Sequence, residues 1–74
     1  MMRKSITREQ LEEIEEALFL NDRETAYSLL KEYAGIEAKP YTAWTFYDCG
    51  GNWLGDSNEY TIRDVLAEAD IGII

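Results

Sequence analysis

The sequence contains no histidine among its 74 residues. This absence removes the side chain that most often acts as a general base near neutral pH, and with it the Ser–His and Cys–His pairs of many hydrolases. It also removes the ligand on which the usual zinc sites depend. We therefore expect a protein that is not an enzyme and that has no metal site and no cofactor.

Cysteine occurs once, as Cys49, so no disulfide can form within the chain. No apolar run approaches the roughly 20 residues that a membrane-spanning helix needs. The charged residues 1–4 resemble the start of a signal peptide, but no apolar segment follows them. These features favour a soluble protein of the reducing cytoplasm that does not bind membranes.

Basic residues are scarce, with seven lysines and arginines against fifteen acidic residues. The net charge is −8 and the pI is about 4.3. Such a surface repels phosphate backbones and attracts positively charged surfaces. Direct nucleic-acid binding is therefore not expected, and a basic protein is the preferred partner.

Proline also occurs once, and Pro40 separates two halves of different composition. A helical pattern precedes it, and aromatic and β-branched residues follow it. A chain of 74 residues is too short to bury two independent cores. We expect a single domain over residues 1–74, of the α+β class and in the order ααββα, with a helical hairpin, a β-hairpin and a covering C-terminal helix.

The first half carries clear helix signals after a flexible start at residues 1–6. Thr7 and Gln10 have the spacing of a capping box, which predicts a helix over residues 8–20. Asp22 is a good N-cap for a second helix over residues 23–34, which Gly35 ends. Apolar residues at three- and four-residue spacing predict that these helices pack together through Leu11, Ile14, Ala17, Leu18, Ala26, Leu29, Leu30 and Tyr33.

The second half begins with a β-hairpin predicted over residues 41–57. Residues 41–47 are rich in aromatic and β-branched side chains, and residues 48–52 supply the Asp, Gly and Asn typical of a turn. Thr61 is expected to cap a third helix over residues 62–70. An apolar tail then ends the chain with Ile71, Ile73 and Ile74.

The turn of the hairpin offers three weak chemical motifs. Cys49 has no neighbouring base, and Asp48 opposes formation of its thiolate. The oxygen-bearing residues Asp48, Asn52, Asp56, Asn58 and Glu59 could suggest a calcium loop, but they lack EF-hand spacing. Three glycines of this segment could suggest a phosphate loop, but no P-loop lysine follows them. An inert turn is the better interpretation of all three.

The first helix concentrates five glutamates in residues 9–16. Four of them, Glu9, Glu12, Glu13 and Glu16, share the face opposite the apolar stripe, where like charges four residues apart repel. Two interpretations stay open. The face could serve solubility alone, or it could bind a basic groove of a partner protein, with Tyr41, Tyr47 and Trp53 of the hairpin adding local contacts.

In size and acidity, the chain resembles phage-encoded inhibitors of host nucleic-acid enzymes, including anti-restriction and anti-CRISPR proteins. The resemblance is compositional and covers the whole chain, but it assigns no role to any single residue. It implies a DNA mimic that occludes the nucleic-acid-binding surface of its partner. The alternative is a structural or assembly protein that self-associates through the hairpin edge and the apolar tail.

Overall fold

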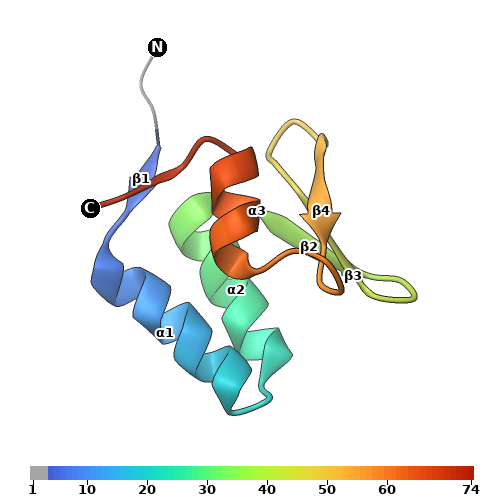
Figure 1. Cartoon of the computed structure of the whole chain (residues 1–74), viewed down its shortest axis with the longest axis horizontal. Helices are drawn as coiled ribbons and strands as arrows, with labels where there is room; N and C mark the ends of the chain where they lie inside the picture. Colours follow the sequence, from blue (N-terminus) through green and yellow to red (C-terminus); the bar gives the residue numbers. More distant parts are fainter. Residues whose placement is uncertain (1–3) are drawn as a thin grey trace.

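The computed structural model describes residues 4–74, which form an α+β fold with three helices, a three-stranded antiparallel sheet and a small parallel strand pair (Figure 1). The elements follow one another as β1 (Ser5–Ile6), α1 (Arg8–Phe19), α2 (Arg23–Ala34), β2 (Glu37–Pro40), β3 (Trp44–Tyr47), β4 (Trp53–Asp56), α3 (Ile62–Glu68) and β5 (Gly72–Ile73). Within residues 4–74, no helix has both the length and the apolar character needed to cross a bilayer.

The helical hairpin forms as its caps predict. Thr7 accepts a 3.1 Å hydrogen bond from the amide of Gln10, whose side chain accepts one of 2.9 Å from the amide of Thr7. Asp22 accepts from the amide of Thr25 at the start of α2, and Gly35 ends that helix at φ +71°. The predicted bounds hold to within one residue, since α1 ends at Phe19.

The sheet contains one strand more than the predicted hairpin. β3 and β4 pair antiparallel as expected, but residues 41–43 form a turn, and β2 pairs with β3 from Glu37 to Pro40. The prediction missed β2 because all four of its residues are of types that disfavour strands. Pro40 is tolerated because it lies at the end of an edge strand, where a missing N–H costs little.

The two ends of the chain meet in the parallel pair β1 and β5. Ile6 is 1 % exposed, and its carbonyl accepts a hydrogen bond from the amide of Ile74. The predicted flexible start is therefore wrong for Ser5 and Ile6, while residues 1–3 lie outside the described residues. The predicted third helix also ends early, at Glu68, because Asp70 adopts φ +58° before β5.

The core lies between the helical hairpin, the sheet and α3. Leu11 and Ile14 come from α1, while Val65 and Leu66 come from α3. Tyr27 of α2 packs on the sheet through two rings, Trp44 at 4.9 Å and Phe46 at 5.3 Å between centroids. Burial of these aromatic rings fixes how the helical hairpin sits against the sheet. Figure 1 shows α1 on the side away from the sheet, with α2 and α3 between them.

Candidate protein-interaction surface

The four glutamates predicted to face solvent on α1 are all exposed. We call Glu9, Glu12, Glu13 and Glu16 the acidic face. Burial of Leu11, Ile14 and Ala17 on the other side of the helix forces these carboxylates outward, because helical residues three or four apart share a face. The sequence pattern therefore placed this surface correctly.

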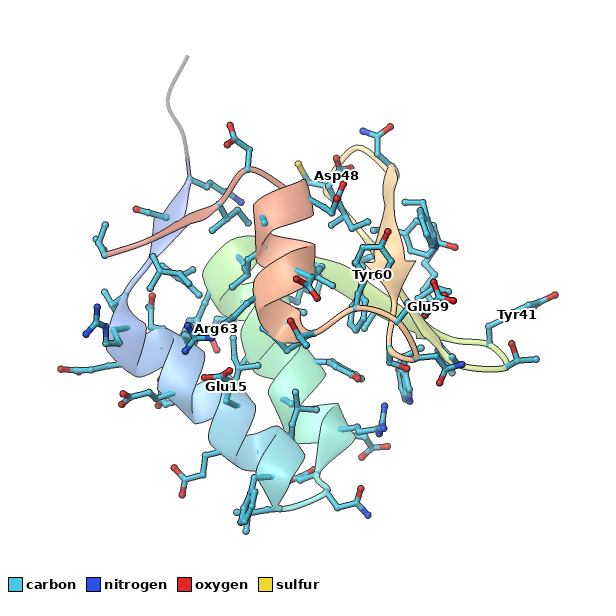
Figure 2. The ribbon with its side chains drawn as sticks, in the orientation of Figure 1. Glu15, Tyr41, Asp48, Glu59, Tyr60 and Arg63 are labelled. Atoms are coloured by element: carbon cyan, nitrogen blue, oxygen red, sulfur yellow. The ribbon has the colours of Figure 1, made fainter. Side chains whose placement is uncertain are left out.

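The ion pairs of the described part of the chain lie away from the acidic face. Lys31 binds Glu37 at 3.2 Å, and Arg63 binds Glu15 at 3.4 Å. Figure 2 shows Arg63 reaching from α3 to Glu15, which borders the apolar side of α1. Among residues 4–74, no cation forms an ion pair with the acidic face. Its charge therefore remains available to a partner.

One member of the acidic face has a neutral partner on α2. The hydroxyl of Tyr33 donates a 2.8 Å hydrogen bond to Glu13 Oε2. This hydrogen bond, reinforced by partial burial and by the charges of Glu13 and Glu32, raises the pKa of the Tyr33 phenol above its ordinary value. Losing the phenolic proton would place two negative charges side by side. The contact thus joins α1 to α2 without neutralising the carboxylate.

Beside the acidic face lies a shallow groove of about 280 Å³ between α1 and α2. We call it the hairpin groove. Its apolar side chains are Ala17, Leu20 and Leu29, and its acidic side chains are Glu13, Glu16 and Asp22. Leu20 is 68 % exposed although it is a large aliphatic residue. The acidic face therefore adjoins an apolar surface.

The hairpin groove was missed in the sequence because its leucines follow the helical apolar pattern. The helical spacing predicts Leu29 in the buried stripe of the second helix, but Leu29 is only partly buried. Leu20 lies three residues after Ala17, at the predicted end of the first helix. A signal existed, since Phe19 and Leu20 cannot both point into the core from adjacent positions.

The predicted aromatic contacts lie apart from the acidic face. Tyr41 is 85 % exposed in the turn between β2 and β3, and Figure 2 places it at the opposite side of the molecule from Glu15 on α1. Trp53 packs edge-on against Tyr60 at 5.9 Å, and Tyr47 lies beneath the Lys39 ammonium at 5.2 Å. Tyr41 therefore lies apart from α1, because the sheet and α1 lie on different sides of α2.

The hairpin turn is organised by its own hydrogen bonds. Asp48 accepts from the amides of Gly50 and Asn52 at 2.8 and 2.9 Å, and from the Asn52 side chain at 3.0 Å. These donors, led by Asn52, lower the pKa of the Asp48 carboxyl. Within residues 4–74, no group of three or more Cys, Asp or Glu side chains is arranged to hold a metal ion. The carboxylate of Asp48 stabilises the turn.

No protein-family model matches this chain, and the comparisons with curated proteins and with solved structures give no significant match.

Proposed function

We propose that this chain is a non-catalytic, acidic interaction module that binds a basic protein and occludes the surface with which that protein binds nucleic acid. The observation that carries the proposal is the acidic face of α1, whose four exposed carboxylates form no ion pair with any cation of residues 4–74. The aromatic side chains Tyr41, Tyr47 and Trp53 are not required for this contact, since they lie on the sheet side.

Electrostatics gives the proposal its physical basis. A row of carboxylates on one helix attracts the lysines and arginines that otherwise contact phosphates, and the net charge of −8 extends this attraction over a Debye length of about 8 Å at physiological salt. Like-charged neighbours destabilise an isolated helix by only a few tenths of a kcal/mol per pair. The fold can therefore tolerate Glu9, Glu12, Glu13 and Glu16 side by side without ion pairs to the cations of residues 4–74.

The experiment that tests the proposal is affinity capture from nuclease-treated bacterial lysate on the immobilised chain. Captured proteins are identified after washes at low and at high salt. We expect a nucleic-acid-binding protein that is lost at high salt and that added duplex DNA competes away. Capture that survives high salt and ignores DNA would contradict the proposal.

A matched pair of variants assigns the effect to α1. Glu12→Lys with Glu16→Lys reverses two charges of the acidic face, and Glu59→Lys with Glu68→Lys reverses two exposed charges elsewhere. Both variants change the net charge equally. Loss of capture in the first variant alone supports a contact at α1, while equal loss in both would show that only overall charge matters.

A second candidate function is self-assembly, which two exposed side chains favour. Trp53 on the edge strand β4 is 55 % exposed, and Ile74 at the end of the chain is 75 % exposed. The tail as a whole does not support the candidate, since Ile71 is buried in the chain's own core and the Ile74 amide is bound to Ile6. Sedimentation across concentration tests it, because a monomer at micromolar concentration would contradict obligate assembly.

A further inference from the structure

We propose that the hairpin groove is a docking site for one basic amphipathic helix of the partner protein, which lies along α1 and α2 as a third helix. This inference rests on the proposed function and names the part of the partner that is bound. It commits to a helix with an apolar stripe flanked by lysines and arginines. The apolar stripe would cover Leu20 and Leu29, and the flanking cations would reach the acidic face.

The groove lies on a part of the helical hairpin that the fold leaves uncovered. Tyr27 of α2 packs on the sheet, while Leu29, two residues later, projects roughly 200° around the helix from Tyr27. Leu29 meets Ala17 and Leu20 of the α1 side in the groove. At its other end, the Tyr33–Glu13 hydrogen bond ties the two helices together. This hydrogen bond helps to hold the two sides of the groove together.

Its dimensions suit a helix. On α1 and the residue that follows it, the lining runs from Glu13 to Leu20, which is about 10 Å along a helix axis and matches about two turns of an added helix. Helices that bind in grooves present apolar side chains at positions i, i+3, i+4 and i+7. Two of these would contact the exposed side chain of Leu20 and the partly buried side chain of Leu29. A helix docked in this way would bury apolar surface that the free chain leaves in water.

The charges of the groove select the occupant. Among the residues that the structure describes, its lining contains Glu13, Glu16 and Asp22, and no lysine or arginine. Three other surface grooves of the described chain each contain a cation, either Arg23 or the pair Lys31 and Lys39. A nucleic acid would be repelled from the hairpin groove, and so would a second copy of this chain docking through the same face. A basic protein segment with apolar side chains matches both the acidic and the apolar residues of the groove.

The test uses two labelled 18-residue peptides and the intact chain. The first peptide places leucines at i, i+3, i+4 and i+7 of a helix, with lysines and arginines beside them. The second has the same composition with its leucines dispersed around the helix. Binding is followed by fluorescence anisotropy at near-physiological salt. We expect the amphipathic peptide to bind at least about tenfold more tightly, because only its leucines can reach the groove together.

Two variants make the result specific to the groove. Leu20→Ser removes an exposed groove leucine, and Phe19→Ser removes the adjacent residue, which is 89 % exposed and lines a different groove. Circular dichroism verifies that both variants remain folded. We expect Leu20→Ser to weaken the amphipathic peptide about tenfold and Phe19→Ser to leave its affinity unchanged.

The outcomes separate this inference from the proposed function. Equal binding of the two peptides, absence of peptide binding, or full affinity in Leu20→Ser would overturn the docking site. A lysate capture that still depends on Glu12 and Glu16 would in those cases leave the proposed function standing. Conversely, tight groove-dependent peptide binding without DNA-competed capture would support the docking site while contradicting occlusion of a nucleic-acid-binding surface.

Discussion

The Tyr33 hydroxyl donates a 2.8 Å hydrogen bond to the Glu13 carboxylate across the two helices of the hairpin. It is a contact between residues twenty positions apart, and it lies at the edge of the acidic face. It orients one carboxylate of that face and holds α1 against α2. Within residues 4–74, Glu9, Glu12 and Glu16 form no ion pair that could do the same. The neutral Tyr33 hydroxyl thus helps to position the acidic face.

The Tyr33–Glu13 hydrogen bond makes the stability of the fold depend on pH in the alkaline range. The pKa of Tyr33 is raised in the folded chain, so its contribution to the free energy of unfolding is complete below the unfolded pKa near 10 and is lost as the pH rises through the folded pKa. We expect Tyr33→Phe to unfold at slightly lower urea concentration than the parent at pH 8, and the difference to disappear as the pH rises through the folded pKa of Tyr33. A difference that stays constant across this range would contradict the assignment.

A second prediction concerns the packing of Gly55 against Tyr60. Gly55 has φ +134°, and a Cβ added there would lie 2.5 Å from the Tyr60 ring. We expect Gly55→Ala to destabilise the fold by about 2–3 kcal/mol, because alanine is strained at this positive φ and the partly buried Tyr60 ring must move. Gly50→Ala is the control, since its Cβ would meet only the side chains of Asp48 and Asn52, at 3.4 Å. Equal unfolding free energies for the two variants would contradict this prediction.

In the strand pair at the chain ends, we expect substitutions of two isoleucines to differ in their effect on stability. Ile6 is 1 % exposed and Ile74 is 75 % exposed, although the backbones of the two residues are hydrogen-bonded to each other. We expect Ile6→Ala to cost about 2–4 kcal/mol by leaving a cavity, and Ile74→Ala to change stability by less than about 0.5 kcal/mol. Denaturant unfolding measures both. A small effect at Ile6 would show that β1 contributes little to the core.

Local signals explain which parts of the fold were predictable. The caps of all three helices lie within three residues of the positions they satisfy, so Thr7, Asp22 and Thr61 could be recognised directly. β2 could not be, because its residues become a strand only by pairing with β3. The pairing of Ile6 with Ile73 joins opposite ends of the chain. Neither segment has a periodic pattern of apolar residues from which this strand pairing could be predicted.

The candidate surface was predictable to the same extent. Helical periodicity alone placed the acidic face on the exposed side of α1. The hairpin groove depends on how α1 and α2 pack, which leaves Leu20 exposed at a position that sequence pattern assigns to a helix end. The separation of Tyr41 and Trp53 from α1 depends on the tertiary arrangement, in which α2 lies between the sheet and α1. The spacing of residues in the sequence does not predict how far the sheet lies from α1.

The central claim is that the acidic face takes the place of nucleic acid on a basic partner, and DNA displacement tests it most directly. A nucleic-acid-binding protein captured by the chain is first bound to labelled duplex DNA, and the chain is then titrated in. The account predicts that the parent chain and the Glu59→Lys/Glu68→Lys variant release the DNA, while the Glu12→Lys/Glu16→Lys variant needs at least about tenfold more protein. Release by all three at equal concentration, or by none of them, would contradict it.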